Sequence, residues 1–505
     1  MVSEVIVNFF LAPHFFSLFF SFLFILISTA LVYGSSNPRQ SFNILSRITL
    51  ACTFFSMLSC FYALFNFVTN VEGSQEIFEF FIEETGVLIV QCGIFLFSFI
   101  CFFLSFNFFF EKKIINVETP FLFFSSMFGS ILLVSSNHSL SFFLSIELQT
   151  LPLFALIALQ RNSASAVEAA LKYYLYSAVS SGLLLFAFSV IYFTSGFLVF
   201  EHLSLFLELA RLKVFDFSKF SPFFNEDFLC EILFKGAILL IYLVLFFKLS
   251  LFPFQFWAPE VYSGATAPII FYLSLIPKLS ILYVLYFFNF HIFYSFGPFF
   301  NPLLIFVGLL SIAIGVLGAV SYQKISKILA FGSTSHFGYL CLFLGCLTPK
   351  NPLSLDFFLI FIFYAIFYAI SLILFFIVWL RVDINGKPAN FTSDFAILNQ
   401  YDKSAAIFLS VAIFSMASLP PFAGFTAKLL IFEYLVFNQQ YFYFIFAAFF
   451  GVASNIFYFR FIKAIFFSQN NNKSQIRSKS LTRFEIFLGS FLCLFLLFIS
   501  LVFVS

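Results

Sequence analysis

Long apolar runs separated by short polar segments fill the chain from about residue 12 onward. A run of about 20 residues is long enough to cross a bilayer as a helix, and fourteen such runs are present. Because hydrocarbon offers no partner for backbone polar groups, helices are the expected spanning elements. We therefore predict an all-α, polytopic membrane bundle of about 14 transmembrane helices, forming a single membrane domain over residues 1–505. The predicted spans are 12–33, 47–69, 86–110, 120–136, 139–159, 168–194, 232–256, 266–289, 300–322, 325–347, 354–380, 404–435, 438–466 and 484–504.

Two of these runs, the seventh and the twelfth, contain helix-breaking residues close to a lysine. Lys248 precedes the break in the seventh run, and Lys428 follows the break in the twelfth. A proline removes a backbone donor and frees a carbonyl one turn back, which loosens the helix. Transporters built from inverted repeats interrupt corresponding helices, so the offset of five helices suggests two related halves. The residues at the breaks are Pro253, Pro420, Pro421 and Gly424.

The composition excludes several classes of protein. The chain is 62% hydrophobic and 10% charged, with a mean hydropathy of +1.06, a balance that no soluble fold has. No basic, aromatic-interleaved face indicates nucleic-acid binding. The eight cysteines form no Cys-x-x-Cys pattern, so we interpret them as small apolar residues and not as an iron–sulfur, zinc or disulfide framework. The 94 phenylalanines fit an AT-rich, organellar gene.

Lysine and arginine residues are divided unequally between the two predicted sides of the membrane. Loops after odd-numbered runs hold sixteen basic residues, and loops after even-numbered runs hold five. Because basic loops stay on the cytoplasmic or matrix side, both termini are predicted on the opposite side. The four remaining basic residues lie within predicted spans. These are Lys172, Lys248, Lys278 and Lys428.

These embedded charges, with Glu147 in the fifth span, are the candidate functional site. A charged lysine at the bilayer centre costs roughly 2.5–3.5 kcal/mol on insertion scales, so a function is the default expectation. A buried lysine holds or releases its proton according to whether a carboxylate is near. A row of lysines joined by water would pass charge along the membrane plane. Ser335 and His336 could hydrate that row, although a hydrogen-bonded structural role is the simpler interpretation of His336.

Static roles remain open at each of these positions. A buried lysine can belong to a fixed ion pair, and Glu147 could be a structural partner only. Lys172, at the start of its helix, is equally consistent with snorkelling to the interface. Glu168 and Glu433 lie near helix ends and are expected at the membrane interface.

Six stretches have a combined order and spacing that is specific. They are Ser145–Leu153, Glu168–Gly182, Phe247–Ala265, Pro277–Lys278, Lys327–Tyr339 and Leu419–Lys428. Together they resemble the antiporter-like subunits of respiratory complex I, in particular subunit 2 of mitochondrial NADH:ubiquinone oxidoreductase and the equivalent bacterial subunit N. The resemblance covers about residues 140 to 435 and is weak in the first 110 residues.

The resemblance implies two inverted five-helix repeats, with helices 7 and 12 discontinuous. The repeats would occupy residues 120–289 and 300–466, after three helices in 1–110 and before a loop and last helix in 467–505. It also implies a role for each embedded charge in a proton relay. Glu147 and Lys248 would form a coupling pair, Lys278 the central relay and Lys428 the link at the far end, with a less certain role for Lys172.

In function, the resemblance implies a proton-translocating, multi-pass subunit of the mitochondrial inner membrane, with both termini on the intermembrane-space side. Electron transfer from NADH to ubiquinone would occur elsewhere in the complex, so no FMN, iron–sulfur cluster, ubiquinone or metal is expected in this chain. Expected partners are other membrane subunits, including neighbouring antiporter-like subunits, and lipids. Two alternatives remain open: a cation/proton antiporter subunit of the same superfamily, and a non-transporting scaffold with static charge pairs.

Overall fold

Helices dominate the computed structural model of this chain. The chain divides into two units, one comprising Met1–Leu249 and Ile276–Pro298, the other Ser250–Leu275 and Phe299–Ser505, and each is described by itself. The structure describes residues 13–32, 38–70, 75–77, 80–114, 116–211, 227–347, 355–384, 387–396, 398–467, 476–478 and 481–504.

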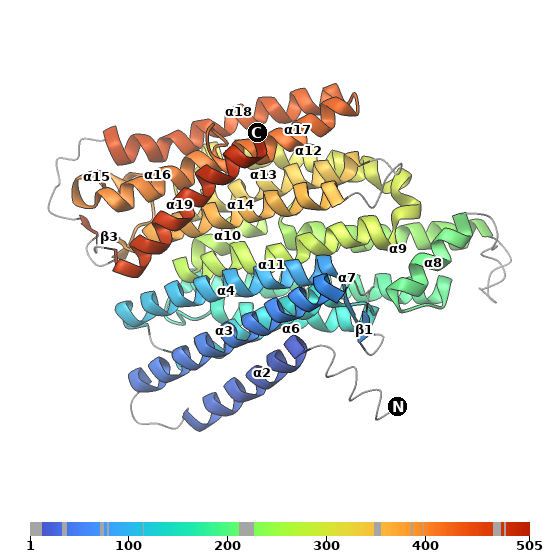
Figure 1. Cartoon of the computed structure of the whole chain (residues 1–505), viewed down its shortest axis with the longest axis horizontal. Helices are drawn as coiled ribbons and strands as arrows, with labels where there is room; N and C mark the ends of the chain where they lie inside the picture. The colour runs from blue at the N-terminus through green and yellow to red at the C-terminus, as the bar shows by residue number, and fades with distance from the viewer. Residues whose placement is uncertain are drawn as a thin grey trace. The chain divides into compact units, whose positions relative to one another are not determined.

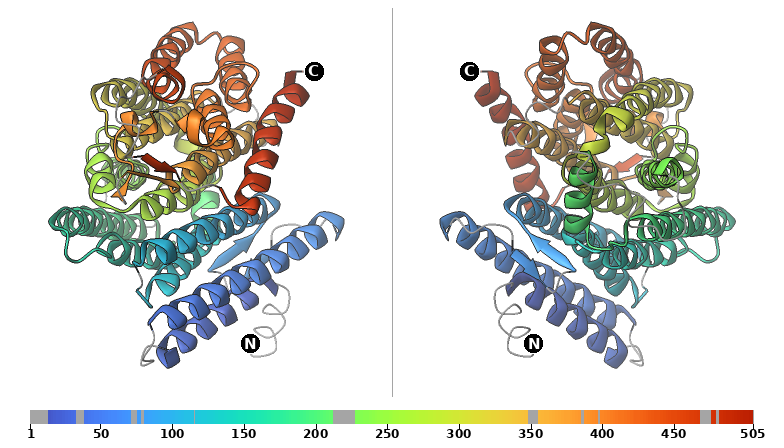
Figure 2. Two further views of the ribbon diagram at one scale, coloured as in Figure 1. Left: turned by 90° about the vertical axis from the view of Figure 1, so that its left-hand side faces the viewer. Right: turned by 90° about the vertical axis from the view of Figure 1, so that its right-hand side faces the viewer.

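In the first unit, helices that are close in sequence pack against each other. Contacts join α2 to α3, α3 to α4, α5 to α6, α6 to α7, and α7 to α9. Figures 1 and 2 show α2 and α3, in dark blue, side by side. The elements are α2 (Pro13–Val32), α3 (Pro38–Asn70), β1 (Gln75–Ile77), β2 (Phe81–Glu83), α4 (Thr85–Lys112), α5 (Thr119–Ser135), α6 (Ser139–Ile157), α7 (Ala164–Ser195), α8 (Phe200–Arg211) and α9 (Asp227–Leu249). The two strands pair antiparallel, with Glu76 opposite Ile82.

Helix α11 (Ala267–Phe287) belongs to both units, because its first turns lie in the second unit and the rest, from Ile276, in the first. A π-helical turn, η2 (Phe288–Ile292), and a 3-10 turn, η3 (Tyr294–Phe296), follow it. Lys278 therefore lies in the same unit as Glu147 and Lys248.

The second unit contains the remaining helices and a small sheet. A three-stranded antiparallel sheet has the order β4-β3-β5, with Asp383 opposite Arg477. Helix α14 packs on α16 and α17, and α10 packs on α13. The elements are α10 (Trp257–Gly264), α12 (Gly297–Ser321), α13 (Ile325–Cys346), α14 (Leu355–Trp379), β3 (Val382–Ile384), β4 (Lys387–Pro388), η4 (Thr392–Phe395), α15 (Leu398–Tyr401), α16 (Lys403–Met416), α17 (Ala423–Phe437), α18 (Tyr441–Ile462), η5 (Lys463–Phe467), β5 (Ile476–Ser478) and α19 (Arg483–Val504).

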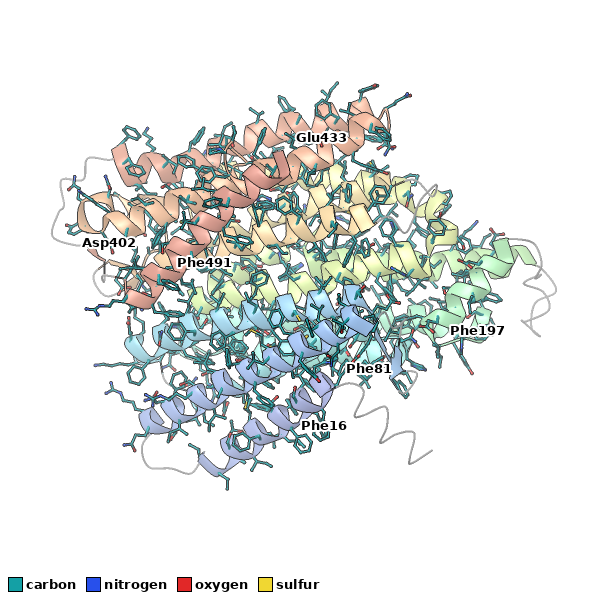
Figure 3. All side chains as sticks on the ribbon, in the orientation of Figure 1. Phe16, Phe81, Phe197, Asp402, Glu433 and Phe491 are labelled. Carbon is teal, nitrogen blue, oxygen red and sulfur yellow. The ribbon has the colours of Figure 1, made fainter. Side chains whose placement is uncertain are left out.

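Local sequence explains several helix ends. Asp402 caps α16, because its Oδ1 accepts hydrogen bonds of 3.0 and 3.2 Å from the amides of Ser404 and Ala405. Figure 3 marks Asp402 at this helix start. Helix α7 ends at Gly196, whose φ of +77° is accessible to glycine without strain.

Small residues bring α12 and α13 close together. A Cβ added at Gly308 would lie 2.6 Å from the Leu342 amide, and one added at Gly315 would lie 2.7 Å from the Ser335 amide. Membrane helices approach most closely where glycine leaves the backbone uncovered. This contact fixes the part of α13 that carries Ser335 and His336.

The all-α, polytopic fold class is confirmed. Eleven described helices are long and apolar enough to cross a membrane, and two shorter apolar helices are Thr119–Ser135 and Lys403–Met416. The predicted helix breaks are also confirmed, since α9 ends before α10 and α16 ends before α17. The predicted connection 195–231 contains the surface helix α8, while 381–403 contains β3, β4, η4 and α15. The proposed repeat boundaries remain predictions.

Candidate functional site

The two interrupted helices share one local geometry. Each break begins with a serine of positive φ, 59° at Ser250 and 57° at Ser418. Both segments, 250–254 and 418–422, read Ser-Leu-x-Pro-Phe. In each, the phenylalanine amide donates to the leucine carbonyl, at 2.7 Å in the first and 3.0 Å in the second. The same turn is therefore built twice, and the pattern of apolar runs does not reveal this short sequence repeat.

The predicted break residues lie at or beside these turns. Pro253 falls between α9 and α10, and Pro420 and Pro421 fall between α16 and α17. Gly424 is the second residue of α17, where an added Cβ would lie only 1.8 Å from the Ser415 carbonyl oxygen. Glycine is required there because a backbone carbonyl occupies the space of a side chain. The second helix can therefore restart only with a glycine at this position.

A further serine supports the first break. The amide of Phe252, inside the non-helical segment, donates a 2.9 Å hydrogen bond to the hydroxyl of Ser311 on α12. An interrupted helix leaves backbone donors without partners, and a buried unpaired donor costs about 1–3 kcal/mol. Ser311 was not predicted, although a serine in an otherwise apolar span is a visible sequence signal.

In the first unit, Lys248 is a buried charge without a hydrogen-bond partner in the described structure. It is the second-last residue of α9, its exposed fraction is 6%, and no described group accepts from its ammonium. Glu147, half-buried on α6, interacts electrostatically with Lys248 and with Tyr173 of α7. The two residues are therefore close enough to interact through charge, but no described hydrogen bond joins them, and their role as a coupling pair remains a prediction.

Lys278 is the most deeply buried of the four lysines, with an exposed fraction of 1%. Near it, the side-chain amide of Gln149 on α6 donates a 2.8 Å hydrogen bond to the hydroxyl of Ser280 on α11. The Ser280 hydroxyl in turn donates to the Pro277 carbonyl at 2.9 Å. The Gln149–Ser280 bond joins α6, which carries Glu147, to α11, which carries Lys278. Neither Gln149 nor Ser280 was predicted from the sequence.

Lys172 has a different environment from the other three lysines. Its ammonium is 2.7 Å from the Glu168 carboxylate, one turn earlier on α7, and the two side chains are 36% and 67% exposed. The structure places Lys172 on an exposed face of α7, and its role in the relay remains a prediction.

In the second unit, Lys428 on α17 lines a groove of about 610 Å³ between α17 and α18. Its exposed fraction is 5%, and its ammonium lies 4.7 Å from the centroid of the Tyr339 ring. Apolar side chains such as Phe432 and Phe444 form most of the wall. Glu433, labelled in Figure 3, also lines the groove and is exposed, and its position at the membrane interface remains a prediction.

His336 lies at the centre of a buried polar cluster. Its Nδ1 is 3.1 Å from the Tyr364 hydroxyl and its Nε2 is 3.1 Å from the Tyr458 hydroxyl. A small cavity beside the ring, also lined by Ser333 and Tyr368, leaves about 10 Å³ for the centre of a water molecule. That is room for about one water. Neutral imidazole donates from one nitrogen and accepts at the other, so one tyrosine hydroxyl accepts from the ring and the other donates to it.

The other predicted hydration residue, Ser335, uses its hydroxyl within its own helix. It donates to the Gly332 carbonyl at 2.7 Å. Tyr364, Tyr368 and Tyr458 were not predicted, because tyrosine in an apolar span is usually a packing residue. Among the residues that the structure describes, no group of three or more His, Cys, Asp or Glu side chains could hold a metal ion.

Comparison with known proteins places this arrangement among membrane subunits of respiratory enzymes. Residues 136–456 match the family "NADH:quinone oxidoreductase/Mrp antiporter, TM". The chain is 33% identical over 361 residues to NADH-quinone oxidoreductase subunit N of Wolbachia sp. subsp. Brugia malayi (strain TRS), which covers 70% of this chain and 71% of that protein. It is 32% identical over 354 residues to NADH-ubiquinone oxidoreductase chain 2 of Metridium senile, covering 70% and 84%.

A solved structure shows the same fold. A chain of respiratory complex I from Thermus thermophilus, in the structure with bound aureothin, matches with a TM-score of 0.71 and 20% sequence identity. The match covers 95% of this chain and 97% of that one.

Proposed function

This chain belongs to the NADH:quinone oxidoreductase/Mrp antiporter transmembrane family, and we propose that it is a proton-translocating, antiporter-like subunit of a respiratory complex I. Relatives named as subunit N and as chain 2 of NADH oxidoreductases support the complex I assignment. The chain is a multi-pass membrane subunit of an NADH-quinone oxidoreductase. Its proton-translocating role rests on the buried charges.

The buried, unpartnered ammonium of Lys248 is the observation that carries the proposal. A buried ammonium without a hydrogen-bond partner is costly, so Lys248 responds strongly to any change in the charge or distance of Glu147. When the carboxylate is near and ionised, the ammonium holds its proton. When the carboxylate moves away or is protonated, the lysine releases the proton. Conformational energy from electron transfer in other subunits would drive this alternation.

The proton released by Lys248 passes to Lys278 in the same unit. The Gln149–Ser280 hydrogen bond holds α6 against α11 at this point, so a movement of α6 acts on both the Glu147 carboxylate and the surroundings of Lys278. Lys278 is the central relay of the proposed pathway.

In the second unit, His336 and Lys428 continue the proton transfer. His336 interacts electrostatically with Lys428, and its two tyrosine partners donate or accept according to the ring's protonation state. One water in the adjacent cavity would extend this cluster toward Ser333. Lys428, which faces the groove, is the terminal site.

A cation/proton antiporter subunit of the same superfamily is the alternative, because the family includes Mrp antiporters. It is less favoured, since the two relatives compared above are both named as NADH oxidoreductase subunits. A scaffold with static pairs is disfavoured by the Lys248 ammonium, which has no hydrogen bond or ion pair in the described part of the chain.

We also propose the mitochondrial inner membrane as the location, with both termini on the intermembrane-space side. The phenylalanine-rich composition and the uneven distribution of basic loops support this assignment. Neighbouring antiporter-like subunits and lipids are the proposed partners. FMN, iron–sulfur clusters and ubiquinone would be bound by other parts of the complex.

Native gel electrophoresis of gently solubilised membranes, stained for NADH oxidation, tests the assignment to complex I. Mass spectrometry should locate this chain in a very large NADH-oxidising band. Migration in a smaller band without that activity would contradict the proposal and favour the antiporter, whose cation-driven proton flux is then measured.

A further inference from the structure

Two buried thiols face each other between α3 and α4 in the first unit. The Sγ atoms of Cys60 and Cys92 are 3.1 Å apart, and the two residues have exposed fractions of 0% and 5%. A disulfide has an S–S bond of about 2.05 Å, so the sulfur atoms need to approach by only about 1 Å more. At this separation one thiol donates a hydrogen bond to the other.

The two cysteines lie at a similar depth from the same connecting segment. Cys60 is ten residues before the end of α3 at Asn70, and Cys92 is seven residues after the start of α4 at Thr85. With a rise of 1.5 Å per residue, both are roughly 10–15 Å from the helix ends. The segment 71–84 between the two helices is rich in glutamate. The distribution of basic residues predicts that it lies on the same side of the membrane as the two termini, opposite the basic loops.

Other cysteines in these helices lack such a partner in the described structure. Cys101, also on α4 and fully buried, has the hydroxyl of Ser105 at 3.9 Å as its contact. Cys52 on α3 is half-buried and is a free thiol. These two residues provide controls on the same two helices.

We propose that Cys60 and Cys92 form a redox-active thiol pair that is oxidised to a disulfide joining α3 to α4. With hydrogen peroxide as the oxidant, one thiol attacks the O–O bond and becomes a sulfenic acid, releasing one water. The second thiol then attacks the sulfenic sulfur, the S–S bond forms, and a second water leaves. The two thiols together lose two electrons and two protons, and one peroxide is reduced to two waters. Oxidation would lock the α3–α4 contact without involving the lysine relay, so this site stands apart from the proposed function.

The chain allows a direct test by protease mapping. No lysine or arginine lies between Arg47 and Lys112, so trypsin leaves all four cysteines on one peptide. A glutamate-specific protease cuts in the acidic segment and separates Cys52 and Cys60 from Cys92 and Cys101. Membranes containing the intact complex are treated with hydrogen peroxide and quenched with denaturing acid. Free thiols are then blocked with maleimide in denaturant near neutral pH, and the protein is digested and analysed by mass spectrometry with and without reductant.

The expected product is a pair of peptides joined through Cys60 and Cys92 that separates on reduction. The joined product should be lost in Cys60→Ser and in Cys92→Ser, and should persist in Cys52→Ser and Cys101→Ser. Fragmentation of the wild-type product assigns the bonded sulfurs even if a variant fails to assemble. Complete maleimide labelling of Cys60 and Cys92 after peroxide, or a joined product that survives in Cys60→Ser, would overturn the proposal.

Discussion

The ammonium of Lys428 on α17 lies 4.7 Å from the centroid of the Tyr339 ring on α13, so the last lysine of the proposed relay packs against an aromatic face. The hydroxyl of Tyr339 donates a 2.8 Å hydrogen bond to the Ala447 carbonyl on α18. One tyrosine thus stabilises a buried cation and joins two other helices. A desolvated cation–π contact contributes about 2 kcal/mol.

Substitutions at Tyr339 separate these two roles. Tyr339→Leu removes the ring and should lower NADH-driven proton pumping by up to roughly tenfold, the equivalent of about 1.4 kcal/mol. Tyr339→Phe keeps the ring and loses only the hydroxyl bond, so pumping should stay close to that of the unmodified protein. Proton uptake into vesicles, normalised to assembled complex, measures both variants. Equal losses in the two variants would show that the ring face does not matter.

The second helix break depends on a glycine. Gly424→Ala places a Cβ 1.8 Å from the Ser415 carbonyl, and overpacking of this kind costs about 1–3 kcal/mol. We expect a lower unfolding temperature and less assembled complex. Gly182→Ala is the matched control, because an added Cβ there meets no atom within 4 Å. A Gly424→Ala variant as stable as Gly182→Ala would contradict the observed geometry of the break.

A buried acid should make the stability of the first unit depend on pH. Glu83, at the end of β2, is 3% exposed, and its Oε1 is 3.2 Å from Nε2 of His14. Burial raises the pKa of Glu83 to about 8, above its unfolded value of about 4.3. The folded chain then binds the proton more tightly, so this stabilisation is complete below about pH 4.3 and is lost as the pH rises through about 8.

Thermal unfolding of the solubilised complex across this pH range tests the effect. The unfolding temperature should fall with rising pH, and Glu83→Gln should flatten the fall because the amide cannot ionise. Glu84→Gln, which removes the neighbouring half-buried carboxylate, is the matched control. The same slope in Glu83→Gln and the unmodified protein would exclude Glu83 as the titrating group.

Hydropathy could predict the helices and the embedded charges, because both follow from the cost of placing polar groups in hydrocarbon. It placed the start of α3 nine residues late, since the helix begins at Pro38 with a polar first turn that extends beyond the apolar run. The prolines at 253, 420 and 421 marked both breaks, because a missing amide is a local property of the chain.

Partners that meet through the tertiary fold could not be predicted in this way. His336 and Tyr458 are 122 residues apart, and Gln149 and Ser280 are 131 apart. A periodicity of apolar residues reports which face of a helix is buried but not which helix covers it. Single polar residues in apolar spans were the available signal, and they identify candidates without pairing them.

Proton pumping by Lys278→Met and Lys248→Met variants is the most direct test of the central claim that buried lysines relay protons. Both should assemble into the NADH-oxidising complex and lose coupled pumping by roughly tenfold or more, since the methionine side chain cannot carry a proton. Lys172→Met, at an exposed ion pair, should lose far less. Near-normal pumping in both buried-lysine variants would contradict the relay.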